Sequence, residues 1–376
     1  MIINLPSQTD LSGFYVVYEG STRLEKKGIY GIAHLMEHLV CKNFDHLQED
    51  FDRDGIDWNA YTSGNEIVFF LTGLDEKVNK WKLEFLDLLS EFNVTKEQFE
   101  NERNIVLEEY MDSFNDQGSA HMLNLDRKLF NDYNPIGLKE DLESLTYMDC
   151  LNFFETQYTK PSKIISVTKG KKFKDTGIKF AEPFKSDKLI EFGNHKVTLE
   201  KSNEFKDKSS VVMLSPIIED NFAEIHFINS MLSLGLKSPL YQEVREKQGL
   251  AYFINCYLSR VNNQGVAAVT TQTSNKNVDK VVDTVKKIFE NPDKFLTKER
   301  FSLVKDYYLV RRQKDDILRY KSVGKWISPQ GWSIDGILDK VKLSDLKDVY
   351  EKYYNFDEFY VSNDKTEFKK NEKEPA

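Results

Sequence analysis

Apolar positions in the first half of the chain alternate between the period of a strand and that of a helix. Residues 13–18 predict a strand, and residues 56–63 and 66–73 predict a hairpin around the turn at Gly64 and Asn65. A further strand is predicted over residues 164–168. Helices are predicted where apolar residues recur every three or four positions, over residues 31–42, 46–54, 78–92, 96–110 and 146–158.

The same order of elements begins again in the second half of the chain. Residues 46–55 and 240–249 both predict a short helix that ends in glycine, and an aromatic-rich strand follows each, over residues 58–61 and 252–257. The later elements are a second strand over 265–271, an amphipathic helix over 278–289 and a charged helix over 298–312. The sequence therefore indicates an internal duplication with a period of roughly 190–200 residues.

The two copies predict two domains. A chain of 376 residues is long for one hydrophobic core, which also favours two domains. Residues 171–190 are rich in Lys, Asp and Gly and show weak periodicity, so we assign them to a linker. The predicted domains are then residues 1–170 and residues 191–376.

Charge and cysteine content narrow the class of protein. The formal net charge of −9 disfavours a nucleic-acid-binding protein, which usually carries a basic surface. Cys41, Cys150 and Cys256 are far apart and odd in number, which indicates reduced thiols and not a disulfide framework. The N-terminus resembles neither a signal peptide nor an organelle presequence, and no apolar run approaches the ~20 residues that span a bilayer. We expect a soluble cytoplasmic protein.

Two histidines in the predicted helix over residues 31–42 suggest a metal site. His34 and His38 are one helical turn apart and project from the same face, which is the geometry that a zinc ion requires from a helix. Glu37 lies beside them, where a carboxylate can act on a metal-bound water. The alternative is an amphipathic helix with two hydrogen-bonded histidines. Cys41 follows one turn later, and we expect it to pack in the core.

A third ligand is available from the predicted helix over residues 96–110. Catalytic zinc usually has three protein ligands and a water, and Glu102 and Glu109 lie two turns apart on one face of that helix. We expect Glu109 to be the ligand and Glu102 to be a carboxylate that orients a histidine or tunes the water. The alternative is a solvated acidic helix face, which is our interpretation of Glu108.

Five segments in order carry a family resemblance. The chain resembles the inverzincin metallopeptidases of the pitrilysin, insulinase and mitochondrial processing peptidase family, whose signature is H-x-x-E-H. H-x-x-E-H alone can occur by chance, whereas five segments in family order make the resemblance specific. The matching segments are Gly31–His38, Asn59–Thr62, Glu102–Glu109, Asn134–Gly137 and Ser238–Tyr252.

The resemblance implies a role for each residue of the metal site. His34, His38 and Glu109 correspond to the zinc ligands, with one Zn²⁺ per chain. Glu37 corresponds to the general base that activates water, and Glu102 corresponds to an assisting glutamate. The second repeat has no H-x-x-E-H in the matching segment, so the resemblance implies a metal site in the first repeat alone.

The resemblance also implies substrate contacts. Arg245 and Tyr252 in the second repeat match an arginine–tyrosine pair that binds substrate and stabilises the tetrahedral intermediate. That role is chemically reasonable, because a guanidinium and a phenol can donate to a developing oxyanion. A strand edge that receives substrate as an added β-strand is matched by Asn59, Ala60, Tyr61 and Thr62.

The implied fold class is α+β. It consists of two homologous repeats, each a mostly antiparallel β-sheet with helices packed on one face, which together form one half of a clamshell chamber. Long family members carry four repeats in one chain, so this chain is expected to form a homodimer, or a heterodimer with a related chain. Arg245 and Tyr252 would then complete the partner's site.

Two segments depart from the family pattern. Residues 233–237 lack the glycine-rich loop of the presequence-binding subunit. The segment before residue 13 is short, so we expect a leading strand to be missing.

The implied activity is that of a zinc-dependent endopeptidase. Its substrates would be peptides or unfolded polypeptide segments, bound as an added strand in the enclosed chamber, with Glu37 as general base. The alternative is a non-catalytic peptide-binding or assembly subunit that retains the family fold.

Overall fold

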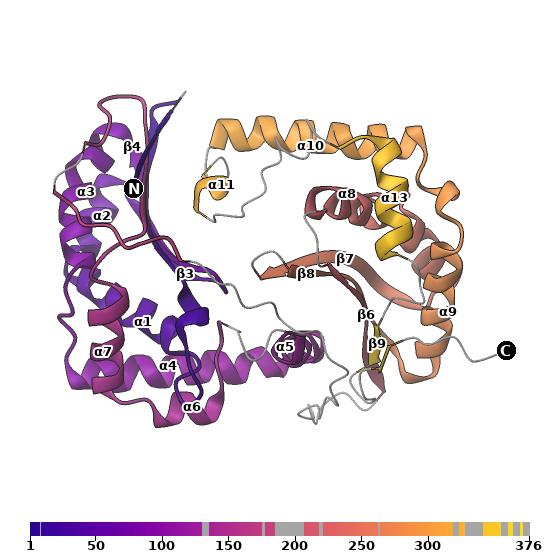
Figure 1. Cartoon of the computed structure of the whole chain (residues 1–376), viewed down its shortest axis with the longest axis horizontal. Helices are drawn as coiled ribbons and strands as arrows, with labels where there is room; N and C mark the ends of the chain where they lie inside the picture. The colour runs from indigo at the N-terminus through magenta and orange to yellow at the C-terminus, as the bar shows by residue number, and fades with distance from the viewer. Residues whose placement is uncertain are drawn as a thin grey trace. The chain divides into compact units, whose positions relative to one another are not determined.

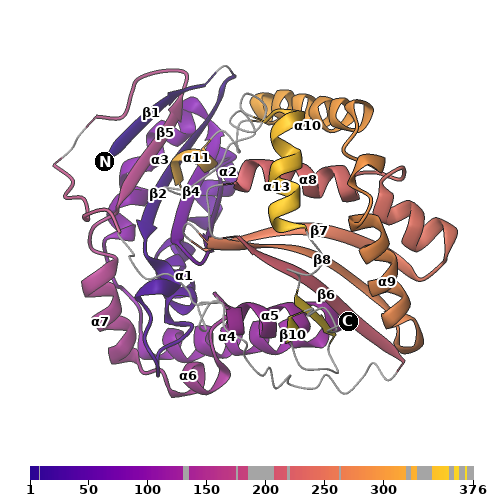
Figure 2. The same cartoon turned by 45° about the vertical axis from the view of Figure 1, so that its right-hand side comes forward.

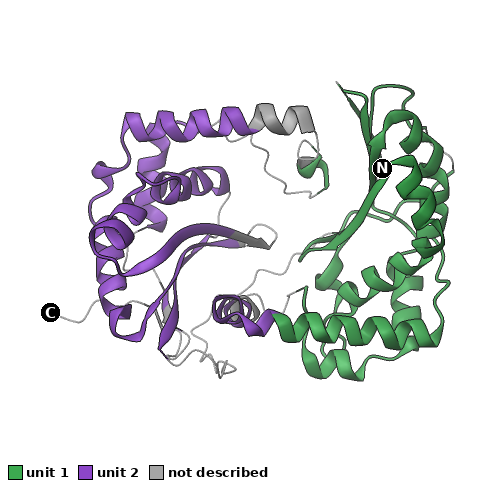
Figure 3. Ribbon diagram, turned by 180° about the vertical axis from the view of Figure 1, so that it is seen from behind, with its two compact units in different colours: residues 1–112, 132–187, 315–331 green, residues 113–131, 188–314, 332–376 purple. Residues whose placement is uncertain are grey.

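The chain forms two compact units, each with its own β-sheet (Figure 1, Figure 3). Unit 1 comprises residues 1–112, 132–187 and 315–331, and unit 2 comprises residues 113–131, 188–314 and 332–376. None of the described helices has the length and apolar composition that a membrane span requires. The computed structural model describes residues 1–7, 9–129, 135–174, 177–184, 207–217, 221–261, 264–318, 323–327, 341–354, 360–363 and 369–370.

The sheet of unit 1 has five strands in the order β1-β5-β2-β4-β3. Strand β1 runs parallel to β5, and the remaining pairs are antiparallel. The expected absence of a leading strand is therefore wrong, because the short N-terminal segment itself forms β1. The strands are β1 (Ile2–Pro6), β2 (Leu11–Glu19), β3 (Asp57–Thr62), β4 (Glu66–Leu74) and β5 (Lys163–Thr168).

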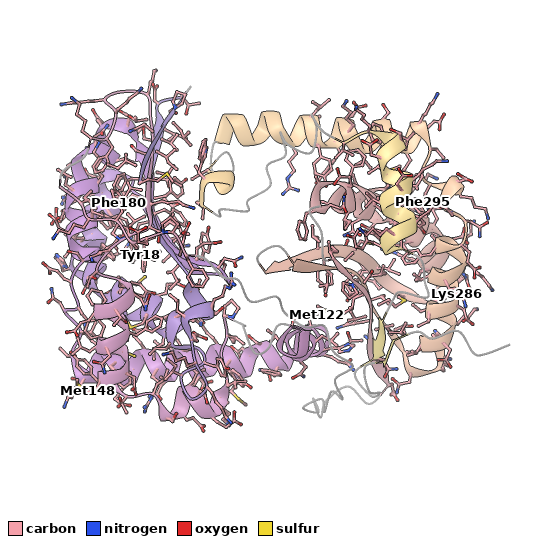
Figure 4. The ribbon with its side chains drawn as sticks, in the orientation of Figure 1. Tyr18, Met122, Met148, Phe180, Lys286 and Phe295 are labelled. Atoms are coloured by element: carbon pink, nitrogen blue, oxygen red, sulfur yellow. The ribbon has the colours of Figure 1, made fainter. Side chains whose placement is uncertain are left out.

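The helices of unit 1 enclose an aromatic core on one face of this sheet. Tyr18, labelled in Figure 4, stacks on Tyr158 with ring centroids 5.0 Å apart, and the edge of Phe69 packs against both rings. The predicted helix over 46–54 begins as a 3₁₀ turn, η2 (Lys42–Leu47), before α2. The helices are α1 (Ile32–Cys41), α2 (Gln48–Asp54), α3 (Asp75–Leu89), α4 (Lys96–Asn115), α6 (Lys139–Ser144) and α7 (Tyr147–Gln157).

The start of α1 is fixed by groups outside the helix. Its N-cap residue Gly31 has a φ of 98° and offers no side-chain hydrogen bond. Glu25 supplies that bond instead, because its Oε1 accepts from the backbone N–H of Ala33 at 2.9 Å. Gly137, from the predicted loop whose Asn134 lies outside the described residues, packs directly against Gly31.

The sheet of unit 2 repeats the arrangement of unit 1 in four of its five strands, and the fifth differs because β1 is parallel to its neighbour whereas β10 is antiparallel. Its order is β10-β9-β6-β8-β7, with antiparallel pairing throughout, so β7 occupies the edge that β3 occupies in unit 1. The α+β class and the two similar repeats are confirmed. The strands are β6 (Lys208–Ile217), β7 (Ala251–Val261), β8 (Gln264–Ser274), β9 (Tyr360–Asn363) and β10 (Lys369–Lys370).

Helices cover one face of the unit 2 sheet (Figure 2). The predicted helix over 240–249 forms as a π-helical turn, η3 (Tyr241–Lys247), and Gly249 follows it with a φ of 59°. Phe295, labelled in Figure 4, lies in the core beside the ring of Tyr350. The helices are α8 (Phe222–Ser233), α9 (Val278–Phe289), α10 (Lys298–Leu318) and α13 (Leu343–Tyr353).

Each unit also contains a segment from the other half of the chain. Helix α5 (Gln117–Leu129) belongs to unit 2, where His121 Nδ1 lies 3.1 Å from Ser210 Oγ on β6. Helix α11 (Gly324–Ile327) belongs to unit 1, where Lys163 Nζ donates to the carbonyl of Ile327. The predicted domain boundary at residues 171–190 stays a prediction, and most of that linker lies outside the described residues. The two units are not continuous along the chain.

Replacing Gly137 by Ala should destabilise the protein more than the same change at Gly55. Both glycines have positive φ, 73° and 66°, so both substitutions carry backbone strain of about 1 kcal/mol. A Cβ at Gly137 would also lie 2.4 Å from Gly31 Cα and 2.6 Å from the carbonyl oxygen of Tyr30, whereas a Cβ at Gly55 meets open space. Urea denaturation of both variants measures the difference, and equal losses of stability would contradict the close packing.

Candidate metal centre

Three predicted ligands converge in unit 1. His34 and His38 project from the side of α1 opposite its buried apolar residues, with their rings 4.9 Å apart. Glu109 on α4 places its Oε2 3.5 Å from His34 Nε2 and 3.8 Å from His38 Nε2. Within the described parts of the chain, these three residues are the one cluster of His, Cys, Asp or Glu side chains able to hold a metal ion.

The donor atoms fit a zinc ion. Ligand atoms about 2.0–2.1 Å from a tetrahedral zinc are roughly 3.3 Å apart, close to the separations of Glu109 Oε2 from the two imidazole nitrogens. Two histidines and one glutamate form a donor set of catalytic zinc sites, which keeps a fourth position open. Burial, with the nearby His38, lowers the pKa of His34 to about 4, so its imidazole is neutral at pH 7 and able to bind a metal.

Glu102 holds one of the histidines in place. Glu102 is a buried residue, and its Oε2 lies 3.3 Å from His38 Nδ1. A proton on Nδ1 directed at this carboxylate leaves Nε2 as the lone-pair donor. The structure thus brings Glu102 to the position that its predicted assisting role requires.

Lys42 contacts Glu102, and we did not single it out from the sequence. Its Nζ lies 3.6 Å from the second oxygen of Glu102 and 2.5 Å from Asp45 Oδ2. The sequence contained the signal, since Lys42 follows His38 by four residues and so lies on the same helix face. The ammonium group therefore balances the charge of the Glu102 carboxylate.

Glu37 lies beside the metal cluster without joining it. Burial raises the pKa of its carboxyl group. Its Oε2 accepts a hydrogen bond of 2.6 Å from Thr62 Oγ1. Cys41 is a partly buried free thiol whose pKa is raised by burial, and it is not part of the cluster.

The predicted substrate strand is an edge of the unit 1 sheet. Strand β3 is last in the strand order, and its side chains alternate between exposed and half-buried. Asn59 and Tyr61 are exposed, whereas Ala60 and Thr62 are half-buried. The strand therefore places the side chain of Thr62 toward α1 and presents Asn59 and Tyr61 on the opposite face.

Arg245 and Tyr252 contact each other in unit 2. The Arg245 guanidinium stacks between the rings of Tyr241 and Tyr252, at 4.8 and 4.5 Å from their centroids. The Tyr252 side chain is 78% exposed, at the start of the edge strand β7. The half-buried Arg245 and the exposed Tyr252 therefore form an adjacent pair of hydrogen-bond donors.

A histidine of the second repeat contacts a hydroxyl group and not a metal-binding carboxylate. On α8, His226 and Ser230 have the same four-residue spacing as His34 and His38 on α1. Both contact the hydroxyl of Tyr308 on α10 at 2.6 Å, and burial lowers the pKa of His226 to about 4. The second repeat thus pairs the half-buried His226 with a neutral hydroxyl group.

Family models match both halves of the chain. The model described as Insulinase (Peptidase family M16) matches residues 5–134, which include the metal cluster. The model described as Peptidase M16 inactive domain matches residues 161–308.

Individual proteins are similar over most or part of the chain. An "Uncharacterized zinc protease" of Rickettsia felis is 24% identical and covers 94% of this chain and 92% of its own. A mitochondrial-processing peptidase subunit beta of Neurospora crassa is 24% identical over 42% of this chain and 35% of its own. The crystal structure of a protease from Helicobacter pylori has the same fold, with a TM-score of 0.74, 18% identity and 96% coverage of both chains.

Replacing Glu102 by Gln should weaken zinc binding by about 10-fold or more. The amide keeps the shape of the side chain but loses the negative charge that stabilises the His38 Nδ1 proton. Competition against a chromophoric chelator measures the affinity. Glu108→Gln, at an exposed position of the same helix, is the matched control and should bind zinc as the wild type does. Equal affinity in the two variants would contradict the role of Glu102.

Proposed function

Because this chain belongs to the insulinase (peptidase M16) family, we propose that it is a zinc-dependent endopeptidase that hydrolyses peptides or unfolded polypeptide segments. The observation that carries the proposal is the convergence of His34, His38 and Glu109, with Glu37 beside them. The half of the chain that matches the insulinase model is the half that contains these residues.

His34, His38 and Glu109 would hold one zinc ion per chain. When bound, the metal supplies Lewis acidity, which polarises the scissile carbonyl and lowers the pKa of water. Glu37 takes the proton of the attacking water and later passes it to the leaving amine. Glu102 keeps His38 oriented throughout, because its Oε2 holds the Nδ1 proton.

Substrate binds as an additional strand along the edge of β3. Backbone N–H and C=O groups of residues 59–62 pair with the peptide, which explains how many sequences can be accepted. Arg245 and Tyr252 donate to the oxyanion that develops on the scissile carbonyl. Their stacking holds both donors in place before substrate arrives.

The working form is a dimer, either of two copies of this chain or of this chain and a related one. Two repeats make half of the four-repeat arrangement, and in a dimer Arg245 and Tyr252 of one chain serve the metal centre of the other. The free thiols of Cys41, Cys150 and Cys256 suit the reducing cytoplasm.

Replacing Glu37 by Gln should abolish peptide cleavage and leave zinc binding intact. The amide cannot accept the proton of water, so turnover of a fluorescent unfolded protein such as casein should fall by about 10²–10⁴-fold. Zinc content of the purified variant is measured in parallel. Glu108→Gln is the control and should retain full turnover, as should wild type stripped by a chelator and reloaded with zinc.

Unchanged turnover in the Glu37→Gln variant would contradict the mechanism. A wild-type protein that holds zinc and binds peptide without cleaving it would favour the alternative, a non-catalytic peptide-binding or assembly subunit.

Mixing two inactive variants should restore activity if the sites are shared between chains. The Glu37→Gln variant lacks the base, and the Arg245→Ala variant lacks an oxyanion donor. In a mixed dimer, one of the two sites combines Glu37 from one chain with Arg245 from the other. Random exchange of a symmetric dimer should recover roughly a quarter of the wild-type activity. Native mass spectrometry confirms that mixed dimers have formed. Mixed dimers without activity would show that Arg245 acts within its own chain.

A further inference from the structure

The side chain of Thr62 is directed at the catalytic base and not at the substrate edge. Alternation along β3 places Thr62 on the same side as Ala60, facing α1. Its Oγ1 donates to Glu37 Oε2 at 2.6 Å, and among the described residues this is the one side-chain hydrogen bond that Glu37 receives. The strand that would receive substrate thus contacts the base directly.

The hydroxyl of Thr62 is held in place by the turn that follows it. Thr62 pairs with Ile67 in the ladder, and Ser63 N–H donates to the carbonyl of Glu66 at 2.8 Å. Ser21, ahead of α1, donates from its hydroxyl to the carbonyl of Ser63 at 2.6 Å. These bonds tie the end of β3 to the segment before α1.

Glu37 needs such a contact because its surroundings are unfavourable for a carboxylate. The side chain is half-buried, and the carboxylate of Glu109 lies nearby. A hydrogen bond to one carboxylate oxygen fixes the rotamer and leaves the other oxygen to accept the proton of the attacking water. Thr62 keeps its own proton throughout, so it positions the base and takes no part in proton transfer.

We propose that Thr62 is a positioning residue for Glu37, which links the substrate-binding strand to the catalytic base. The inference rests on the proposed peptidase function and deepens it. A peptide that adds to the edge of β3 extends the ladder by new backbone hydrogen bonds and stiffens the strand. Through its hydrogen bond, Thr62 then restricts the orientation of the Glu37 carboxylate. The base is therefore correctly oriented when a peptide is bound along the strand.

Two substitutions at Thr62 separate the hydroxyl from the shape of the side chain. Thr62→Val keeps the β-branched shape and removes the donor, whereas Thr62→Ser keeps the donor. We expect Thr62→Val to lower kcat by roughly 10- to 100-fold with little change in KM, because a bond to a charged group is lost. Thr62→Ser should retain kcat within about threefold of wild type. Thr62→Ala serves as a second hydroxyl-free variant should Thr62→Val fail to fold.

Readouts other than turnover distinguish positioning from damage to the fold. Zinc affinity by chelator competition and binding of a fluorescent peptide to the metal-free protein should be the same in wild type, Thr62→Val and Thr62→Ser. In the Glu37→Gln background, Thr62→Val should cause no further loss of the residual turnover, because the base that it positions is absent.

Three results would overturn the inference while leaving the peptidase proposal intact. These are an unchanged kcat in Thr62→Val, a kcat in Thr62→Ser as low as that of Thr62→Val, or a full additional loss in the Glu37→Gln background. Failure of the proposed function is a separate outcome, seen as a zinc-loaded wild type that does not cleave peptides.

Discussion

Helix α1 must bury an apolar face and at the same time hold two imidazoles beside a carboxylate, although its first turn has no side-chain cap of its own. Two interactions hold the start of the helix in place. Gly31 packs against Gly137, and the backbone N–H of Ala33 donates a hydrogen bond to Glu25. Both come from outside the helix. The positions of His34, Glu37 and His38 therefore depend on packing at the helix start, and α4 and β3 then add Glu109 and Thr62 around them.

Local periodicity was sufficient to predict most elements around the metal centre. Helix α1, the β3–β4 hairpin and the start of α4 each have a strong pattern within about fifteen residues. Strand β1 was missed because its pairing with β5 joins residues about 160 positions apart, which no local pattern encodes. The exchange of α5 and α11 between units was missed for the same reason. The contact of Thr62 with Glu37 joins a strand and a helix, and tertiary packing decides it.

The two repeats show how one arrangement of helices can support different chemistry. In unit 1, two histidines on α1 meet a carboxylate of α4, and this donor set fits a divalent cation. In unit 2, a histidine and a serine on α8 meet a tyrosine of α10, and hydrogen bonds satisfy all three. Neutral hydroxyl groups bind zinc poorly, so this cluster of unit 2 is not suited to hold the metal.

The central claim is that zinc is bound by His34, His38 and Glu109. X-ray absorption at the zinc edge, on protein loaded with one equivalent of zinc, tests it most directly. The account predicts two imidazole nitrogens and oxygen donors at about 2.0–2.2 Å, with no sulfur. A zinc–sulfur distance of about 2.3 Å would bring Cys41 or another thiol into the site and contradict the assigned ligands. Failure of the protein to retain zinc would contradict the account as a whole.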